Sequence, residues 1–359
     1  MIETKLRARI RLENGAEFEG WSFGYDKPCD GEVVFSTAMV GYPESLTDPS
    51  YSGQILCVTY PLIGNYGVPN EGTDEMGISK NFESEKIWVR GLVISEYSFN
   101  YSHWDAVKSL DAWLKEHNIP GIYGIDTRAL TQVLRENGSM LGMIVPEGVA
   151  KDFPIKDPNA ENQISLVSCK KVISYGSSEK KVVLVDCGVK HNILRCFVKR
   201  GIEVIRVPWD YDFTDMQYDG LFISNGPGNP EFCGITEEHI KKAMSMEKPI
   251  FGICMGNQLL ARAGGAKTYK LKYGHRSHNQ PVRLSGTNNC YITSQNHGYA
   301  VDNNTLGEDW EPLFINMNDG TNEGIKHKSK PFFSVQFHPE ASSGPTDTEF
   351  LFDEFISKL

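Results

Sequence analysis

The sequence predicts an α/β protein with two domains, and three observations support this prediction. The chain has 359 residues, about twice the length of a typical domain. From residue 181 onward, short apolar runs alternate with helical patterns, as in a parallel sheet covered by helices on both faces. Before residue 150, strand and helix patterns follow one another without that alternation. We therefore expect a mixed α/β domain at residues 1–150, a linker at 151–180, and a domain at 181–359 with a central, mostly parallel sheet flanked by helices.

The first domain opens with a hairpin pattern. Apolar and charged residues alternate over residues 8–12, and the turn pair Asn14-Gly15 follows them. Short apolar runs predict further strands, and helically spaced apolar residues predict two helices. The strands are expected at residues 32–35, 54–60 and 89–94, and the helices at residues 103–117 and 127–137.

The second domain begins with a fully apolar strand, after a stretch rich in turn formers and charges. Its first helix is expected to end at Gly201, because glycine adopts the left-handed conformation that stops many helices. In such a sheet, ligands bind at the carboxyl ends of the strands, and Cys254 lies at one such end. The expected elements are strands at 181–185, 202–207, 220–224 and 248–253, and helices at 192–200 and 237–246.

The composition excludes several classes of function. A net charge of −10 makes the chain a poor nucleic-acid binder, because phosphate contacts need clustered Lys and Arg. No apolar run reaches the ~18 residues of a membrane span, and the N-terminus lacks the apolar core of a signal peptide. The eight cysteines are scattered without a Cys-x-x-Cys pair, so neither a zinc site nor a disulfide framework is indicated. We expect a cytoplasmic protein that binds neither nucleic acid nor membrane.

One cysteine stands on a strand–turn–helix pattern. The run Phe251-Gly-Ile-Cys254-Met-Gly256 joins an apolar strand to a helical pattern, like the Gly-x-Ser-x-Gly elbow of serine hydrolases. Glycine tolerates the strained backbone and close approach that such a turn needs. A thiol at the start of a helix is also favoured as thiolate by the helix dipole. Cys254 is therefore a candidate nucleophile, and the alternative is a buried cysteine on an ordinary turn.

Two further segments carry groups that cysteine chemistry needs. Asn225-Gly226-Pro-Gly228 is a rigid turn whose backbone N–H groups can stabilise an oxyanion, although a plain tight turn has the same composition. Near the C-terminus a strand pattern runs into His338-Pro-Glu340. There His338 can act as the base and Glu340 as the group that orients it. The alternative is an exposed histidine beside a carboxylate.

Other motifs are weaker. Polar residues interrupt a strand pattern at 293–299, which fits either a pocket or a loop at a sheet edge. His275 and His278 resemble a metal pair, but no third ligand lies nearby in the sequence, so we expect no metal site. The segment 265–268 resembles the end of a P-loop with its residue order broken, so we expect no nucleotide site.

Taken together, the motifs around Cys254, Gly226 and His338 resemble those of class I, triad-type glutamine amidotransferases. The first half is similar to the small subunit of carbamoyl phosphate synthetase, so the resemblance covers essentially the whole chain. The triad motifs specify only glutamine hydrolysis, whereas the N-terminal motifs specify which synthetase receives the ammonia. The N-terminal motifs are Gly31-Glu-Val-Val-Phe35, Gly41-Tyr-Pro-Glu-Ser-Leu-Thr-Asp48-Pro-Ser50, Tyr60-Pro-Leu-Ile-Gly64-Asn65 and Gly124-Ile-Asp126-Thr127-Arg128.

The resemblance implies a role for each matching residue. Cys254 attacks the side-chain amide of L-glutamine, releases ammonia and leaves a γ-glutamyl thioester. His338 moves the protons, and Glu340 orients it. The residues implied to bind glutamine are Met255 and Gly226, whose N–H groups hold the oxyanion, and Ser50, Gly228, Gln258, Asn296, Gly298 and Tyr299, which line the pocket.

The resemblance also implies a partner. Ammonia passes through a protein tunnel to a large, ATP-using subunit, which combines it with bicarbonate and phosphate to give carbamoyl phosphate for arginine or pyrimidine synthesis. We therefore expect no cofactor in this chain, with ATP and Mg²⁺ on the large subunit, and a heterodimer able to form higher oligomers. Because the chain starts with Met1 and ends soon after Phe355, we expect a free-standing subunit.

One position departs from the family pattern. Many relatives carry histidine where this chain has Asn257, and some relatives have lost the nucleophile that this chain keeps. Asn257 is not a triad residue, so we expect activity to survive. Two alternatives remain open: an amidotransferase or γ-glutamyl hydrolase of another pathway, and a regulatory subunit that has lost turnover.

Overall fold

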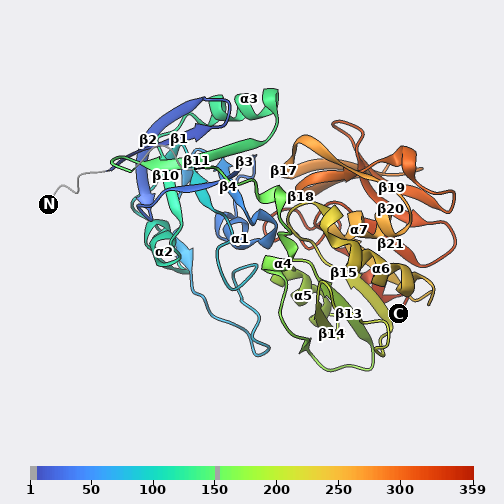
Figure 1. Ribbon diagram of the computed structural model, residues 1–359. Coiled ribbons are helices and arrows are strands. Elements are labelled where there is room, and N and C mark those ends of the chain that lie inside the picture. Colours follow the sequence, from blue (N-terminus) through green and yellow to red (C-terminus); the bar gives the residue numbers. More distant parts are fainter. Residues whose placement is uncertain (1–5, 150–153) are drawn as a thin grey trace. The chain divides into compact units, whose positions relative to one another are not determined.

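The computed structural model describes residues 6–149 and 154–359, which form two compact units (Figure 1). The N-terminal unit comprises Met1–Gly72 and Ser79–Glu161, and the C-terminal unit comprises Thr73–Ile78 and Asn162–Leu359. Residues 150–153, at the start of the expected linker, lie outside the described residues. Residues 162–180 of that linker cluster with the C-terminal unit and carry α4 (Ile164–Val167) and β12 (Ile173–Tyr175).

The N-terminal unit is built on a closed barrel with the strand order β1-β11-β3-β4-β7-β10-β2. The pairs β3–β4, β4–β7 and β7–β10 are parallel. Ile10, Val33, Ile55 and Ile122, from four different strands, are fully buried in one apolar cluster. The barrel strands are β1 (Arg7–Leu12), β2 (Glu17–Gly24), β3 (Cys29–Ser36), β4 (Gln54–Val58), β7 (Gly91–Val93), β10 (Pro120–Tyr123) and β11 (Met140–Pro146). The other elements are β5 (Leu62–Ile63), β6 (Val68–Pro69), β8 (Glu96–Tyr97), β9 (Ala106–Lys108), α1 (Tyr42–Thr47), α2 (Leu110–Glu116), α3 (Thr127–Asn137) and the 3₁₀ turns Pro49–Tyr51 and Pro158–Ala160.

The helix expected at residues 103–117 was predicted too long. The helix α2 begins only at Leu110, and the residues before it form β9. The side chain of Ser109 accepts a hydrogen bond from the backbone of Ala112, which caps the helix at this point. The expected helix included Trp104 because this residue is spaced from the later apolar residues as on one helix face. Its side chain is 89% exposed, so it does not belong to a buried helix face.

The C-terminal unit contains a ten-stranded sheet with the order β12-β14-β13-β15-β16-β21-β20-β19-β17-β18. The expected α/β class is confirmed, and the parallel part consists of the five strands from β14 to β21. An antiparallel extension continues it from β20 to β18. The parallel strands are β13 (Lys181–Asp186), β14 (Glu203–Pro208), β15 (Gly220–Ile223), β16 (Ile250–Ile253) and β21 (Phe332–Val335). The extension consists of β17 (Thr268–Leu284), β18 (Cys290–Val301), β19 (Trp310–Asn316) and β20 (Asn322–His327).

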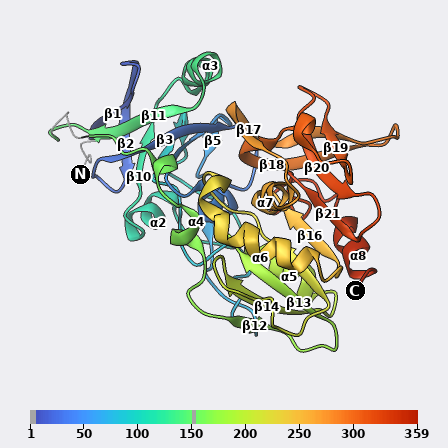
Figure 2. The same ribbon diagram turned by 45° about the vertical axis from the view of Figure 1, so that its right-hand side comes forward.

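Helices cover both faces of the parallel strands. Val182 and Leu184 of β13 join an apolar cluster with α5 and α8, whereas Val183 and Val185 join another with α6 and α7. This alternation follows from the two-residue period of a strand, and it explains why the strand is apolar throughout. Figure 2 shows α6 and α7 lying over the sheet. The helices are α5 (His191–Val198), α6 (Gly234–Met244), α7 (Met255–Ala263) and α8 (Phe350–Ile356), with 3₁₀ turns at Pro230–Cys233 and Asn303–Thr305.

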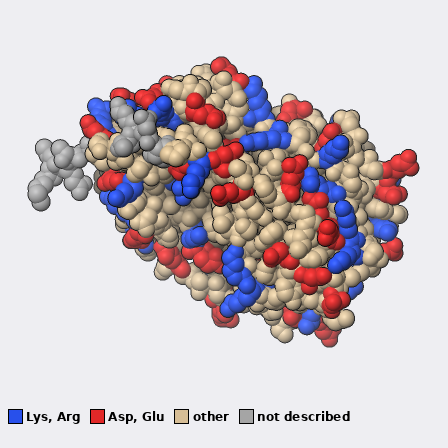
Figure 3. Space-filling view, in the orientation of Figure 1, with Lys and Arg blue, Asp and Glu red and all other residues tan. Residues whose placement is uncertain are grey.

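The helix α5 was expected at residues 192–200, and it spans His191–Val198, so it ends slightly before the expected position. The helix stops at Val198, and Gly201 follows with a left-handed φ of 71°. None of the described helices is long and apolar enough to cross a membrane. On the face drawn in Figure 3, acidic and basic side chains of the described residues are interspersed. That face therefore shows no continuous basic stripe of the kind that follows a nucleic-acid backbone.

The packing of α8 generates a stability prediction. Phe352 is fully buried, and its ring lies 5.2 Å from Phe197 and 5.8 Å from Phe251, measured between centroids. We expect Phe352→Ala to lower the free energy of unfolding by about 3–5 kcal/mol, because it leaves a cavity in the core. The matched control is Phe350→Ala on the same helix, where the side chain is 41% exposed and the expected loss is about 1 kcal/mol or less. Urea unfolding followed by circular dichroism measures both, and equal losses would contradict the packing described.

Candidate active site

Cys254 lies on a sharp turn between β16 and α7. Its φ of 55° is in the left-handed region, where a non-glycine residue is strained. A Cβ atom on Gly252 would lie 2.6 Å from the backbone of Gly256, and one on Gly256 would lie 2.1 Å from the carbonyl oxygen of Ile223. No side chain fits at either position. The prediction of an elbow whose neighbours must be small is therefore confirmed.

Sheet pairing brings the segment of His338 to this elbow. The strands β16 and β21 are parallel neighbours, with Ile253 opposite Val335. The backbone N–H of Cys254 donates to the carbonyl of Val335 at 2.8 Å. Cys254 and His338 thus follow the carboxyl ends of adjacent strands, where parallel sheets place their ligands. The pairing explains how residues far apart in the sequence share one site.

The imidazole of His338 is buried and oriented by a carboxylate. Its Nδ1 lies 2.7 Å from Oε1 of Glu340, and both side chains are essentially inaccessible to solvent. Burial opposes a charge on the ring. The negative charge and the hydrogen bond of Glu340, together with the nearby Cys254, outweigh this and raise the pKa of His338 to about 10. The Sγ atom of Cys254 lies 3.6 Å from the carbonyl oxygen of Asn296. The thiol, imidazole and carboxylate are all buried, and Cys254 lies near enough to influence the pKa of His338, while Nε2 of His338 makes no hydrogen bond to the described residues.

The sequence analysis missed Lys190, which stabilises the charge of Glu340. Its Nζ lies 3.1 Å from Oε1 of Glu340, and the side chains are 6% and 0% exposed. Burial favours the neutral acid, but the charges of Lys190 and His338 hold the pKa of Glu340 at about 2. Asn192 also donates a hydrogen bond to the backbone carbonyl of Glu340. Both residues follow β13, so the rule that ligands gather at strand ends could have found them.

The residues expected to hold an oxyanion lie in tightly packed backbone. Gly226 follows β15, and a Cβ atom there would lie 2.1 Å from the carbonyl oxygen of Cys187. Met255 is the first residue of α7, where backbone N–H groups have no partner within the helix. The two amides therefore belong to the ends of the neighbouring strands β15 and β16. Their role as an oxyanion hole stays a prediction.

Several residues expected to bind glutamine lie close to Cys254. Asn296, Gly298 and Tyr299 belong to β18, and the side-chain amide of Gln258 donates to the carbonyl of Tyr299 at 3.1 Å. Gly228 has a φ of 82° and packs against the side chain of Gln163. Ser50 lies in the N-terminal unit, where its backbone N–H donates to Asp48. The glutamine-binding role of all these residues stays a prediction.

Asn257, which departs from the family pattern, is a buried structural residue. Its Nδ2 lies 3.1 Å from Oε1 of Gln336, and its Oδ1 accepts a hydrogen bond of 2.8 Å from Ser334. The side chain is fully buried, and these bonds join α7 to β21 and the residues that follow it. The side-chain amide of Asn257 therefore ties α7, which follows the Cys254 elbow, to the neighbouring strand β21. This arrangement gives it no direct part in the thiol–imidazole–carboxylate cluster.

Comparison with known proteins matches both halves of the chain. Residues 10–144 match the family described as carbamoyl-phosphate synthase small chain, CPSase domain, and residues 183–358 match glutamine amidotransferase class-I. The chain is 55% identical over 353 residues to the multifunctional protein CAD of Squalus acanthias, covering 97% of this chain and 16% of that protein. It is 52% identical over 356 residues to the mitochondrial carbamoyl-phosphate synthase [ammonia] of Mus musculus, covering 98% of this chain and 24% of that protein.

These relatives are much longer than the chain, which spans about one sixth to one quarter of their length. Among solved structures, a glutamine amidotransferase from Thermotoga maritima matches with a TM-score of 0.39 and 19% identity, covering 46% of this chain and 77% of that one. The two family matches together take in both units and the Cys254 elbow. The chain therefore belongs to the carbamoyl-phosphate synthase small chain family, with a class I glutamine amidotransferase domain in its C-terminal half.

Proposed function

We propose that this chain hydrolyses L-glutamine and supplies the ammonia for carbamoyl phosphate synthesis. The observation that carries the proposal is the buried cluster of Cys254, His338 and Glu340, with 2.7 Å between His338 Nδ1 and Glu340 Oε1. A nucleophile, a proton carrier and an orienting carboxylate are what amide cleavage through a covalent intermediate needs. The match of residues 10–144 to the small-chain family supports the choice of pathway.

The first chemical step is attack by the sulfur of Cys254, whose proton has passed to the imidazole of His338, on the side-chain carbonyl carbon of glutamine. A new C–S bond forms, and the carbonyl electrons move to oxygen. We assign the binding of this oxyanion to the backbone N–H groups of Gly226 and Met255, since fixed donors are effective because they need no reorganisation. The strained backbone of Cys254 presents the sulfur at the edge of the sheet.

His338 carries the protons in both halves of the reaction. The raised pKa of about 10 keeps the imidazole protonated at neutral pH in the free site. It can therefore protonate the leaving nitrogen as the C–N bond breaks, which releases ammonia and leaves the γ-glutamyl thioester. The neutral imidazole then takes a proton from water, and the hydroxide attacks the thioester to release glutamate. Glu340 stabilises the imidazolium, and Lys190 keeps Glu340 ionised.

The ammonia needs an acceptor, which we place on a large synthetase portion that uses ATP and Mg²⁺. That portion is either a separate chain or part of the same polypeptide, as in the multifunctional relatives. Ammonia is mostly protonated in neutral water and then cannot attack, so a sheltered path preserves the reactive form. A cytoplasmic site for this reaction remains our proposal, although the mouse relative is named mitochondrial.

Replacement of the nucleophile tests the proposal directly. We expect Cys254→Ser to abolish glutamate release, because a hydroxyl is a far weaker nucleophile than a thiolate at neutral pH. In a complex with the synthetase portion, synthesis of carbamoyl phosphate from added ammonium should persist. Glutamate and carbamoyl phosphate assays measure the two activities, and Cys290→Ser, on an exposed cysteine, is the matched control. Full glutamine use by Cys254→Ser would refute the mechanism, and loss of both activities would make Cys254 structural.

The proton carrier gives a second prediction. We expect His338→Asn to lower kcat for glutamine hydrolysis by about 10²–10⁴-fold, because a general acid–base contributes that much. The half-exposed His117, in the N-terminal unit, provides the control His117→Asn, which should keep the wild-type rate. Steady-state glutamate release measures both variants. A wild-type rate in His338→Asn would assign the proton transfers to another group.

A third prediction concerns Lys190. The pKa of Glu340 is about 2, because the charge of Lys190 helps to offset the effect of burial, which favours the neutral acid. Lys190→Met removes that charge, so the pKa of Glu340 should rise. Glu340 would then become neutral at a higher pH on acidification. We therefore expect the acid limb of kcat/KM for glutamine to move to higher pH.

The matched control for this variant is Lys199→Met, which removes a surface ion pair with Glu349. It should leave the pH profile unchanged. An unaltered acid limb in Lys190→Met, with intact circular dichroism, would show that Lys190 does not act through Glu340.

A further inference from the structure

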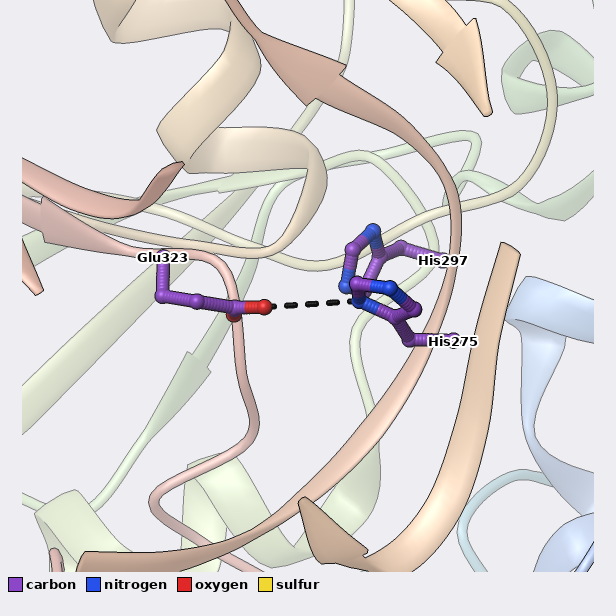
Figure 4. Close-up of side chains that lie close together, drawn as sticks. All are labelled: His275, His297 and Glu323. Atoms are coloured by element: carbon purple, nitrogen blue, oxygen red, sulfur yellow. Dashed lines mark ion pairs between the residues drawn. The ribbon is translucent and has the colours of Figure 1, made fainter. Parts of the chain in front are cut away.

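A second polar cluster lies in the antiparallel part of the C-terminal sheet (Figure 4). His275 on β17 and His297 on β18 are directly opposite each other in the strand pairing, so their side chains share one face. Glu323 on β20 points toward them. One ligand atom from each of the three residues lies within 4.8 Å of the others, and all three residues are buried. Their side chains belong to the types that bind transition metals.

The imidazole of His275 lies between the carboxylates of Asp319 and Glu323. Nε2 of His275 lies 2.8 Å from Oδ2 of Asp319, which leaves Nδ1 facing Oε1 of Glu323 at 3.4 Å. Asn316 donates to the same Oε1 at 2.8 Å, while Oε2 of Glu323 is buried and makes no hydrogen bond to the described residues. Carboxylate partners of this kind fix the orientation of metal-binding histidines.

His297 is held between two hydrogen-bond acceptors. Its Nδ1 lies 2.8 Å from the carbonyl oxygen of Tyr299, so Nδ1 must carry the proton. Its Nε2 lies 3.1 Å from Oε1 of Gln295. The Gln295 amide is oriented by Thr293, whose hydroxyl donates to the carbonyl of Gln280 and therefore accepts from Nε2 of Gln295. In a neutral imidazole, the lone pair of Nε2 thus faces an oxygen lone pair.

Two arrangements can relieve this contact between acceptors. One is a second proton on His297, but this would bury a positive charge whose only hydrogen-bond partners among the described residues are neutral oxygens. The other is a cation between Nε2 of His297 and its neighbours. The cation would also satisfy Glu323, whose free oxygen is otherwise a buried acceptor without a donor.

We propose that His275 Nδ1, His297 Nε2 and the Glu323 carboxylate bind one divalent transition-metal ion, and that zinc fits best. Two neutral imidazoles and a carboxylate form a typical zinc ligand set, and Oε1 of Gln295 or a water can take the fourth position. Zinc bonds of about 2.0–2.2 Å place ligand atoms roughly 3.4 Å apart, so the side chains must converge only slightly. The charges of Glu323 and Asp319 balance the two positive charges of the ion.

The ion would act as a structural clamp. It joins β17, β18 and β20, and β18 carries the carbonyl groups of Asn296 and Tyr299 that contact Cys254 and Gln258. The sequence suggested no metal because the ligands come from three distant segments, and because His275 pairs with His297 and not with His278. The alternative is that no metal binds and that His275 forms ion pairs with Asp319 and Glu323.

The test is stoichiometric metal binding by the full chain, prepared without an affinity tag and stripped with a chelator. A Cys254→Ser background keeps the catalytic thiol from binding metal. We expect one equivalent of Zn²⁺ by isothermal titration and by elemental analysis, a rise in Tm on binding, and visible absorption of a tetrahedral site with Co²⁺. Binding of no equivalent, or only of weakly held ions without a defined stoichiometry, would overturn the proposal.

Three variants assign the ligands in that same background. Glu323→Gln should weaken Zn²⁺ binding by at least 100-fold, and Asp319→Asn, which acts through His275, by about 10–100-fold. Glu311→Gln, on the surface of the neighbouring strand β19, is the matched control and should bind normally. Unchanged affinity in Glu323→Gln would refute the site. Should Glu323→Gln fail to fold by circular dichroism, unchanged affinity in the surface variant Asp319→Asn would refute it instead.

Discussion

The active site depends on the parallel pairing of β16 with β21. This pairing places the residues after Ile253 and after Val335 side by side at the carboxyl ends of the two strands. A hydrogen bond from the backbone N–H of Cys254 to the carbonyl of Val335 fixes the register at this point. A shift of one residue in register would turn every side chain to the opposite face of the sheet. The apolar faces of both strands are buried under helices on either side, so such a shift is strongly disfavoured. The position of Cys254 is therefore a property of the whole sheet.

The same sheet edge concentrates charges that cannot be stable alone. Lys190, Glu340 and His338 are nearly or completely buried, and removing one member of such a group leaves the others without compensation. Burying these charged groups costs free energy and is a poor source of stability for the fold. Their contacts instead set the protonation states of Glu340 and His338. Glu340 remains ionised in a dry environment, and the imidazole beside it keeps its proton. The electrostatics of the site follow from mutual compensation among charged residues that follow two strands, β13 and β21.

The sequence was informative where local pattern and chemistry coincide. The elbow at Cys254 was predictable because both glycines are needed for backbone contact, and the end of α5 was predictable from Gly201. The helix before Leu110 was overextended because the cap at Ser109 was overlooked. Lys190 was missed because its partner Glu340 lies far along the chain, and its position after β13 was the only signal that pointed to the site. The barrel of the N-terminal unit was not foreseen either, since closure depends on pairing between distant strands.

The order of the site residues along the chain has a consequence for biosynthesis. The thiol emerges from the ribosome before the imidazole, because β16 precedes β21 along the chain. A nascent or prematurely terminated polypeptide therefore carries a cysteine with no proton carrier beside it. Under the proposed mechanism such a fragment lacks the group that protonates the leaving nitrogen. Turnover therefore starts only after folding has paired β16 with β21.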